Sequence, residues 1–380
     1  MEANNFCCMK MVFICGALEP GKDGVGDYTR RLSAALIKQG ISVSILAYND
    51  KFIKKKIEEL QSSDGSEIPC LRLPHTWTSK QRTQQAKNWV DKYNPDWLSL
   101  QFVIYSFHNK GLPFGISSQL KQIVSDRKCQ IMFHETWLGL KTNDSLKYQI
   151  IGFLQKRIIK RLRSAIKFKV VHTHTQFYMR ELNKIGFYNV KYLPVFSNIP
   201  VIDIKESPYK ENKKVKFVLF GSIHPNVDFV EFFNELQDFY KHKMGFTLEV
   251  IFIGKSGRFL DPWINELKSR KIPFSTLGEQ NPESISEVLQ QVNYGITTNP
   301  SFVVEKSGTV AAMREHGLKV IIVAEKTEPK DTFKLKFNKS LFEYKSGNLK
   351  EFLEDGHKKN TDVLGINSVA QKFLNDIKAG

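Results

Sequence analysis

The feature that most constrains the fold is an alternation of short apolar runs with longer amphipathic segments, which starts twice along the chain. Short apolar runs separated by segments of helical period predict parallel strands with crossover helices. In the first half the predicted strands are Met11–Cys15, Val43–Ala47, Trp97–Ile104, Gln130–Phe133 and Phe168–Val171. In the second half they are Val215–Phe220, Leu248–Ile253, Tyr294–Thr297 and Val320–Ala324. The pattern therefore predicts an α/β chain with two doubly wound domains.

The expected domain boundaries lie where this alternation stops. The segment Leu193–Glu211 contains three prolines and has neither a helical nor a strand period. We therefore expect an N-terminal domain at 1–195, a linker at 196–212 and a second domain at 213–360. Residues 361–380 remain, and their pattern predicts a C-terminal helix. A chain of 380 residues has room for this arrangement, since a domain commonly has about 150 residues.

The net charge is the most unusual quantity in the composition. Lys and Arg number 56 and Asp and Glu number 39, which gives +17 at pH 7. Such an excess of positive charge bears on binding partners and not on the fold. A nucleic acid, an anionic membrane surface or a phosphorylated substrate would each be attracted by it. Between Ser145 and Arg180 there are nine basic residues and no acidic residue. Just over half of the excess therefore lies in one segment.

This segment has the pattern of an amphipathic helix with a cationic outer face. One helical face carries Ile151, Leu154, Ile158, Leu162 and Ala165. Phe153 lies among the basic side chains, and an aromatic on a basic face fits an anionic membrane surface. A solvated helix and a nucleic-acid surface stay open as alternatives, although no recognised nucleic-acid-binding motif accompanies the helix. The predicted membrane-binding residues are Lys156, Arg157, Lys160, Arg161, Arg163 and Lys167.

A glycine-rich loop follows the first predicted strand. It reads GALEPGKDGVGDYTR and leads into a helix predicted at Val25–Gln39. A helix N-terminus favours an anion, and Gly24 and Gly26 would let a phosphate or sugar approach the backbone. Asp27 is the expected helix cap. The dinucleotide fingerprint is incomplete because Thr29 stands at its third glycine, so a plain strand-to-helix turn remains the alternative.

A second anion-binding loop is predicted in the second domain. Glu305, Lys306, Ser307, Gly308 and Thr309 precede a helix predicted at Val310–His316. The positive charge of a lysine is unfavourable beside the positive end of a helix dipole unless an anion is bound there. The lysine and the helix N-terminus together therefore suit a diphosphate.

Another lysine, Lys255, follows the strand Leu248–Ile253 in the sequence Gly254-Lys255-Ser256. The upstream glycine of a P-loop is missing, because Glu249 stands at its position. Lys255 can still serve the same ligand, since open α/β sheets bind ligands at the carboxyl ends of strands.

Three histidines lie at predicted strand ends. His134 opens the sequence HETW, where it could orient or polarise a substrate. A zinc-protease motif is excluded because Leu138 stands at its second histidine. His172 and His174 alternate along a later strand and are expected to point the same way, but no third metal ligand accompanies them. Packing or lining of a ligand site is the favoured interpretation, and no metal site is predicted.

The cysteines and the apolar segments bear on location. Five cysteines at irregular spacings fit neither a disulfide framework nor a zinc site. No segment is long and apolar enough to span a bilayer, and the layout of a signal peptide is absent. We therefore expect a reduced, cytoplasmic protein that associates peripherally with the inner face of the membrane.

Several of these segments together resemble the GT-B glycosyltransferases, close to the large retaining group that includes bacterial mannosyltransferases and sucrose synthase. PGKDGVGDYTRRLSAALIKQGISVSILA is similar to the family's opening loop and helix, and IMFHETW to the strand whose His contacts the donor sugar. VVHTHTQFYMREL is similar to the strand and helix before the linker. FGSIHP and VVEKSGTVAAMREHGLKVI are similar to the first strand-loop and the donor-diphosphate helix of the donor domain.

The resemblance implies two Rossmann-like domains that face a cleft, with the C-terminal helix crossing back to the first domain. It implies transfer of a sugar from a nucleotide-diphosphate donor to a hydroxyl of a glycan, glycolipid or other acceptor, with retention of configuration and without a cofactor or metal. Polysaccharide biosynthesis is the expected setting. His134 and Glu305 occupy the implied catalytic positions. The implied donor-binding residues are Gly24, Gly26, Lys255, Lys306, Ser307, Gly308 and Thr309.

The chain also departs from the family pattern, which has two glutamates eight positions apart. Glu305 matches the first, and Met313 stands at the second. Ser222 and His224 stand where the family has a basic residue, although Lys306 could supply that phosphate charge. Two alternatives therefore come from other classes. One is a GT-B-like protein without activity that binds a glycan or a partner, and the other is a basic nucleic-acid-binding protein.

Overall fold

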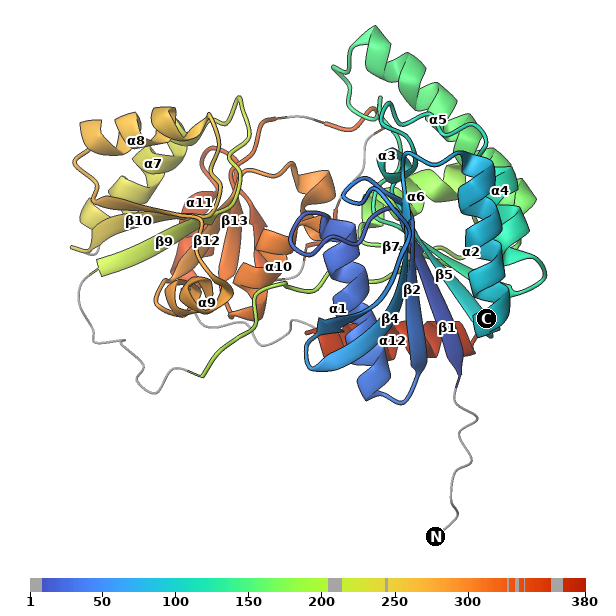
Figure 1. Ribbon diagram of the computed structural model, residues 1–380. Helices are drawn as coiled ribbons and strands as arrows, with labels where there is room; N and C mark the ends of the chain where they lie inside the picture. Colours follow the sequence, from blue (N-terminus) through green and yellow to red (C-terminus); the bar gives the residue numbers. More distant parts are fainter. Residues whose placement is uncertain are drawn as a thin grey trace. The chain divides into compact units, whose positions relative to one another are not determined.

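The computed structural model of the chain describes residues 9–203, 214–242, 245–326, 328–331, 335–337, 339–356 and 365–380. The chain divides into two compact units, and each contains a sheet with helices on both faces (Figure 1). Unit 1 comprises Met1–Pro194 together with Ile366–Gly380, and unit 2 comprises Val195–Gly365. The α/β fold with two doubly wound domains is therefore confirmed.

Within its described residues, unit 1 has an eight-stranded sheet in the order β3-β4-β2-β1-β5-β6-β7-β8. Neighbouring strands are parallel except β3 and β4, which form an antiparallel hairpin. The strands are β1 (Lys10–Cys15), β2 (Ser42–Asp50), β3 (Ile57–Ser63), β4 (Ser66–Pro74), β5 (Trp97–Phe102), β6 (Lys128–Phe133), β7 (Phe168–Thr173) and β8 (Lys191–Tyr192). The helices are α1 (Gly24–Lys38), α2 (Ser79–Tyr93), α3 (Ile104–Phe107), α4 (Ile116–Val124), α5 (Leu146–Ala165), α6 (Gln176–Lys184) and α12 (Ile366–Lys378).

The two faces of the unit 1 sheet differ in chemistry. One face is apolar, and side chains such as Ile14, Leu100 and Phe133 pack in one buried cluster with α2, α4 and α5. The other face lies under α1 and α12 and carries several buried polar side chains. Phe373 of α12 stacks on Phe13 of β1, with 6.0 Å between the ring centroids. The C-terminal helix therefore belongs to the core of unit 1, as the resemblance implies.

Unit 2 has a six-stranded parallel sheet in the order β11-β10-β9-β12-β13-β14 within its described residues. The strands are β9 (Lys214–Phe220), β10 (Thr247–Ile253), β11 (Phe274–Gly278), β12 (Tyr294–Thr297), β13 (Lys319–Ile322) and β14 (Leu341–Glu343). The helices are α7 (Phe229–Gln237), η1 (Asp238–His242), α8 (Leu260–Ser269), α9 (Pro282–Gln290), η2 (Ser301–Lys306), α10 (Gly308–Glu315) and α11 (Leu349–Glu354). Helices α7, α8 and α11 share one apolar cluster with the sheet, and α9 and α10 share the other.

Both sheets have the same kind of switch in strand order. β1 lies between β2 and β5, and β9 lies between β10 and β12, so the chain moves outward from its first strand in both directions. At such a switch point the loops at the carboxyl ends of the strands diverge, and open α/β sheets bind ligands there. The topology therefore predicts ligand binding at the loops after β1 and β5 and at those after β9 and β12.

Two local predictions are wrong. β5 ends at Phe102, so the predicted strand Trp97–Ile104 is too long, because Ile104 begins the short helix α3. Asp23 caps α1 in place of Asp27, since its carboxylate accepts a hydrogen bond from the N–H of Gly26 at 2.8 Å. Asp27 lies in the first turn and accepts from the N–H of Gly21 instead.

The predicted linker extends beyond residue 203 into residues outside the described ones. Its first part belongs to unit 2 and is hydrogen-bonded to helices of that unit. The N–H of Ser197 donates to Glu315 at 2.6 Å, and the N–H of Ile202 donates to the hydroxyl of Ser286 at 3.1 Å. These contacts join residues 197–202 to α9 and α10.

Two further observations concern the expected environment. In the described part of the chain, no helix combines the length and apolarity needed to cross a bilayer. Cys15, Cys70 and Cys129 are free and buried, whereas Cys7 and Cys8 lie outside the described residues. Burial raises the pKa of the Cys70 thiol to about 12, so this thiol is unreactive at neutral pH.

Candidate active site

The loop after β1 is held by a cluster of ion pairs. Asp50 is fully buried and accepts hydrogen bonds from the N–H of Leu18 at 3.1 Å and from Nε of Arg72 at 2.8 Å. Arg72 also donates to Glu19, which belongs to the same loop, at 2.6 Å. Removing one partner from such a buried pair commonly costs about 3–5 kcal/mol. The loop is therefore fixed before any ligand binds.

The two predicted donor-binding glycines at this loop have different surroundings. A Cβ on Gly26 would lie 2.7 Å from the carbonyl oxygen of Ala17, so contact between α1 and the loop requires this glycine. A Cβ on Gly24 would meet nothing within 4 Å. Beside them, burial raises the pKa of the capping Asp23 above its usual range. Only Gly24 has the open backbone that a ligand would need, and a donor role for either glycine stays a prediction.

His134 lies just after β6, buried at the carboxyl edge of the unit 1 sheet. Its Nε2 is 2.9 Å from Oε1 of Gln101, and its Nδ1 is 3.1 Å from Nε2 of His174. The ring of Tyr28 from α1 packs edge-on against both imidazoles. The structure thus brings His134, His174 and the first turns of α1 together. Both ring nitrogens of His134 have partners within unit 1, and its contact with a sugar stays a prediction.

The described residues contain no candidate metal site. No group of three or more His, Cys, Asp or Glu side chains is placed to hold an ion there. His172 and His174 lie on the same face of the unit 1 sheet. Beneath α1 and α12, each makes polar contacts with other side chains of that face.

Three loops are joined at the carboxyl edge of the unit 2 sheet. The N–H of Ile223 donates to the carbonyl of Ser256 at 3.0 Å, which joins the loops after β9 and β10. The N–H of His224 donates to the hydroxyl of Thr298 at 2.9 Å, which joins the loops after β9 and β12. Ser222 and His224, the residues in place of the family's basic residue, are therefore at the switch point of this sheet.

The predicted residues at 305–309 form one continuous structure beside this switch point. Glu305 and Lys306 end the 3₁₀ helix η2, and α10 begins two residues later. Ser307 caps α10, with its hydroxyl accepting from the N–H of Val310 at 3.4 Å and lying 3.1 Å from the hydroxyl of Thr309. No acidic residue lies in the first turn of α10. A lysine, two hydroxyls and a helix N-terminus are thus gathered where an anion is favoured.

The position of the family's second glutamate is part of the core. Met313 is fully buried, and its sulfur approaches Gly295 of β12 so closely that a Cβ there would lie 2.6 Å away. Glu315 does not replace it, because its carboxylate accepts the hydrogen bond from Ser197. A carboxylate at 313 would be buried in an apolar cluster.

Lys255 lies on the loop after β10, on the same edge of the sheet. Its ammonium is 3.6 Å from the carboxylate of Glu279, and both side chains are largely exposed. Such an exposed pair contributes at most about 1 kcal/mol, so Lys255 can turn toward a ligand at little cost. The strand β9 separates β10 from β12, which places Lys255 about 10 Å along the sheet from the strand that leads to Lys306.

The predicted basic helix exists as α5, but its buried face differs from the prediction. Ile158 and Leu162 are buried as expected, whereas Ile151, Leu154 and Ala165 are only partly buried. Gly152, Gln155 and Ile159 complete the buried face. The reason is a close approach at Gly152, where a Cβ would lie 1.9 Å from the carbonyl oxygen of Leu138. The predicted face is therefore wrong in part.

The exposed side of α5 carries a stripe of two halves. Leu146, Ile150 and Phe153 follow at helical spacing and are 72%, 54% and 58% exposed. Arg157, Lys160 and Arg161 continue the stripe toward the end of the helix and are also exposed. We call these six residues the α5 stripe. Apolar side chains thus precede basic ones on one surface.

The other predicted membrane-binding residues have different surroundings. Lys156 is partly buried with its ammonium 5.0 Å from the ring centroid of Trp137. Arg163 donates to the carbonyl of Gly186 at 3.0 Å. Lys167 is exposed but follows the end of the helix.

A groove of about 510 Å³ lies between the basic half of the α5 stripe and α4. Its lining combines cations with hydroxyl groups, a combination that suits phosphate. The hydroxyl of Ser117 is buried and has no hydrogen-bond partner in the described part of the chain. The lining residues are Ser117, Ser118, Lys121, Lys160, Arg161, Ser164 and Ala165.

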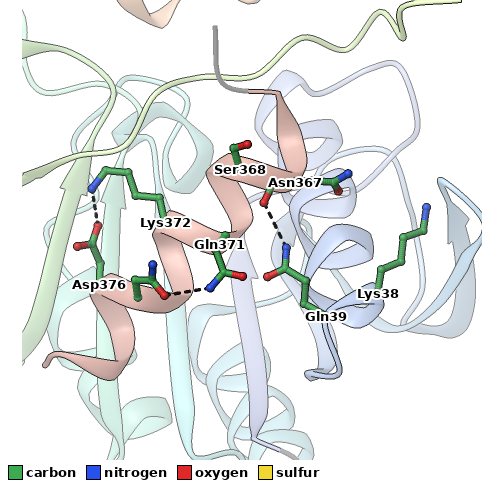
Figure 2. Close-up of a pocket in the computed structure, with 8 residues that line it drawn as sticks. Lys38, Gln39, Asn367, Ser368, Gln371, Lys372 and Asp376 are labelled. Carbon is green, nitrogen blue, oxygen red and sulfur yellow. Dashed lines mark hydrogen bonds and ion pairs between the residues drawn. The ribbon is translucent and has the colours of Figure 1, made fainter. Parts of the chain in front are cut away.

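A larger depression, of about 750 Å³, lies between α12 and the end of α1 (Figure 2). Gln39 at the end of α1 donates there to the carbonyl of Asn367 at 3.2 Å. Lys372 and Asp376 of α12 also line it. Because α1 ends at the amino ends of the parallel strands, this depression is at the edge opposite the loops discussed above, and we assign it no ligand.

Comparison with known proteins supports the fold. No family model matches the chain, and no curated protein does. A lipopolysaccharide outer core galactosyltransferase, WaaB, has a similar structure with a TM-score of 0.56 and 14% identity, covering 98% of this chain and 99% of that chain. The catalytic domain of starch synthase IV from Arabidopsis thaliana, bound to ADP and acarbose, gives 0.55 and 11%, with the same coverage. Anabaena HepE, in complex with UDP and glucose, gives 0.53 and 12%, covering 96% and 94%.

These similarities extend over nearly the whole chain. The structure therefore has the fold of the GT-B glycosyltransferases, as the sequence resemblance predicts.

Several polar residues on and after the strands of the two sheets are not predicted from the sequence. Thr298 and Asn299 follow β12, and Asn299 donates to the cap residue Ser307 at 3.3 Å. Ser99 and Gln101 on β5 alternate with apolar residues, and that alternation was available as a signal of a polar face. A strand is predicted here from the sequence without use of this alternation.

Proposed function

We propose that the chain is a glycosyltransferase that moves a sugar from a nucleotide-diphosphate donor to a hydroxyl of an acceptor. The observation that carries the proposal is the α10 N-terminus, where Lys306, Ser307 and Thr309 lie beside the switch point of the unit 2 sheet. The GT-B fold supports it, as do the nucleoside diphosphates bound in two similar structures, UDP beside glucose in HepE and ADP beside acarbose in starch synthase IV. Unit 2 holds the donor in this proposal, and unit 1 the acceptor.

The chemistry is mainly electrostatic. Negative charge develops on the departing diphosphate, and prearranged N–H groups at the start of α10 together with Lys306 and Lys255 stabilise it. Glu305 accepts hydrogen bonds from sugar hydroxyls, and His134 positions the donor sugar. Ser307, Gly308 and Thr309 let the phosphates approach the helix. Retention of configuration is proposed from the resemblance to the retaining group, and no metal or cofactor is needed for these roles.

Donor binding is tested first by a thermal-shift screen of nucleoside diphosphates and nucleotide sugars, because a ligand that binds only the folded state raises its stability. We expect Lys306→Ala to weaken the selected ligand about tenfold or more, since a charge-assisted hydrogen bond contributes about 1.5–3 kcal/mol. Lys350→Ala on α11 is the matched control, because Lys350 is exposed and pairs only weakly with Glu354 at 3.6 Å. Unchanged binding in Lys306→Ala would refute the proposed diphosphate site.

Activity is tested separately by transfer assays with the nucleotide sugar that binds. Transfer to a glycan or glycolipid acceptor is expected. Glycan binding without turnover across a panel of donors would favour the alternative of an inactive GT-B-like protein. The reason to consider this alternative is that the buried Met313 stands in place of the family's second glutamate.

We also propose that the α5 stripe binds the anionic inner face of a membrane, where a lipid-linked acceptor would be held. Its basic half gains about 1 kcal/mol per residue near anionic lipid. Its apolar half gains about 1.5–3 kcal/mol for each large side chain that becomes buried. The groove with Lys121 and Ser117 offers a place for a phosphate of the lipid headgroup.

Vesicle binding separates the two halves of the stripe. Replacing Arg157, Lys160 and Arg161 with Gln is expected to abolish binding to anionic vesicles at low salt. Replacing Leu146, Ile150 and Phe153 with Ser is expected to weaken binding even when salt screens the charges. Neutral vesicles are the control. Unchanged binding in both variants would mean a merely solvated helix, and binding to RNA or DNA but not to vesicles at matched salt would favour the nucleic-acid alternative.

A further inference from the structure

A row of polar side chains crosses the face of the unit 1 sheet that lies beneath α1 and α12. Ser99, Gln101, Gln130 and His172 are fully buried, and the histidines after β6 and β7 are at most 8% exposed. Buried polar groups are costly unless each finds a hydrogen-bond partner. In this row every member contacts the next, so the row forms one continuous network.

The outer half of the network starts on the C-terminal helix. Nε2 of His172 lies 3.1 Å from a carboxylate oxygen of Asp376, and its Nδ1 lies 3.1 Å from Nε2 of Gln130. The hydroxyl of Ser99 lies 2.6 Å from Oε1 of Gln130 and 2.8 Å from Nε2 of Gln101.

The inner half reaches the carboxyl ends of β6 and β7. Oε1 of Gln101 lies 2.9 Å from Nε2 of His134. Nδ1 of His134 lies 3.1 Å from Nε2 of His174, whose Nδ1 lies 2.8 Å from the carbonyl oxygen of Leu193.

Both ends of the network can only accept hydrogen bonds. Leu193 contributes a carbonyl oxygen, and Asp376 contributes an ionised carboxylate. Burial opposes that ionisation, but hydrogen bonds from His172, Lys191 and Lys372 outweigh it and hold the pKa of Asp376 below its usual range (Figure 2 shows the contact with Lys372). A network that ends in acceptors on both sides must obtain all of its hydrogens from the groups between them.

The hydrogens do not suffice when all of these groups are neutral. Seven contacts join the two ends, and each needs one hydrogen. Six groups lie between the ends, and each supplies one hydrogen to the network, because every neutral imidazole, amide and hydroxyl here donates on one side and accepts on the other. The network is therefore one hydrogen short.

The direction of the bonds locates the missing hydrogen. Nδ1 of His172 faces the amide nitrogen of Gln130, which can only donate, so the ring is neutral and its one hydrogen is on Nε2, toward Asp376. Burial, which lowers the pKa of His172, acts in the same sense. Nδ1 of His172 then accepts from Gln130, Gln130 accepts from Ser99, and Ser99 accepts from Gln101. The remaining atom of Gln101 is its carbonyl oxygen, so His134 must donate to it from Nε2. From the other end, the carbonyl of Leu193 obliges His174 to donate from Nδ1. Two lone pairs would then face each other across 3.1 Å.

We propose that His134 and His174 share one proton beyond those of two neutral imidazoles, so that unit 1 holds a buried cation at the carboxyl ends of β6 and β7. Among the described residues, titratable groups beside the network include Tyr28 from α1, Lys191 from β8, Lys372 and Asp376 from α12, and Glu135, which follows His134 in the chain.

The cation favours an anionic ligand group at this edge of the sheet, such as a phosphate. If the proposed glycosyl transfer holds, His134 then acts on the substrate through its charge, and His172, His174 and Asp376 are positioning residues. The charge itself does not depend on that function.

The test counts hydrogens on the imidazole nitrogens of the full chain by ¹⁵N NMR with labelled histidine at pH 7.5, where an ordinary histidine with a pKa of about 6.5 is mostly neutral. We expect three nitrogen-bound hydrogens on the His134–His174 pair of the wild-type protein. In Asp376→Asn the new amide can donate to His172 and supplies the seventh hydrogen, so we expect two. Lys372→Gln is the matched control, because it removes an ion-pair partner of Asp376 but keeps the carboxylate, and three are expected.

Gln101→Met provides a second variant that is independent of α12. It cuts the network between Ser99 and His134, frees His134 to donate toward His174, and should leave two hydrogens on the pair. Two hydrogens in the wild-type protein, or three in a folded Asp376→Asn or Gln101→Met protein, would overturn the proposal. A protein without transferase activity that still shows three hydrogens would refute the proposed function and leave this inference intact.

Discussion

The glycines of the first loop show how a missing side chain can serve either the fold or a ligand. Gly24 and Gly26 are two positions apart at the start of α1, and the sequence predicts the same role for both. Their surroundings separate them, because the carbonyl of Ala17 fills the space at Gly26 and nothing fills the space at Gly24. A motif can thus mark a site correctly without showing which of its residues faces a ligand.

The matched pair Gly26→Ala and Gly24→Ala tests this distinction. We expect Gly26→Ala to lower the free energy of unfolding by about 1–3 kcal/mol, because the new Cβ meets backbone atoms that cannot move aside. Gly24→Ala should change it by no more than about 0.5 kcal/mol. Urea denaturation measures both. Equal destabilisation by the two substitutions would contradict the assignment of Gly26 to the fold.

At the scale of elements, strands and helices with a clear period were predictable, and their orientation was not. The four strands predicted in the second half correspond to β9, β10, β12 and β13. The helix at 146–165 was expected from its apolar spacing, but the contact between Gly152 and Leu138 turns it away from the expected face. Gly152 and Leu138 belong to different segments of the chain. The apolar spacing within the helix therefore does not reveal their contact. The network from His134 to Asp376 was hidden for the same reason.

The C-terminal helix offers a test at this scale. Phe373 is fully buried and lies against Phe13 and His172, with ring centroids 6.0 Å and 5.7 Å away. We expect Phe373→Ala to lower the free energy of unfolding of unit 1 by about 3–5 kcal/mol. Gln371→Ala, on the exposed side of the same helix, should change it by about 0.5 kcal/mol or less.

Calorimetry reports the two substitutions on α12 as shifts in the unfolding transition of unit 1. Because α12 belongs to unit 1, the transition of unit 2 should keep its temperature in both variants. A shift confined to unit 2 would show that the helix packs elsewhere.

For the molecule as a whole, acid should weaken unit 1 in two stages. Burial lowers the pKa of His172 in the folded state below the unfolded value of about 6.5. At this histidine the unfolded chain therefore binds more protons below that pH, and the contribution of His172 to stability is full above pH 6.5 and falls as the pH drops, by at most about 1.4 kcal/mol per pH unit. The proton that we propose on the His134–His174 pair has the opposite effect, because the folded protein keeps it at pH values where an unfolded histidine loses it. The folded pKa of Asp376 is also lowered, so its contribution is present above about pH 3.9 and is lost in stronger acid.

Urea denaturation between pH 4.5 and 7.5 follows the first stage, and His172→Gln is the informative variant. Glutamine can still contact Asp376 and Gln130 but does not titrate, so the fall in stability between about pH 6.5 and 5 should become smaller. Asp23 acts in the opposite sense, because burial raises its pKa and protonation relieves that cost in acid. That relief belongs to a group elsewhere in unit 1 and is present in both proteins, so it cancels in the comparison. An unchanged profile in folded His172→Gln would show that this histidine does not govern the acid response.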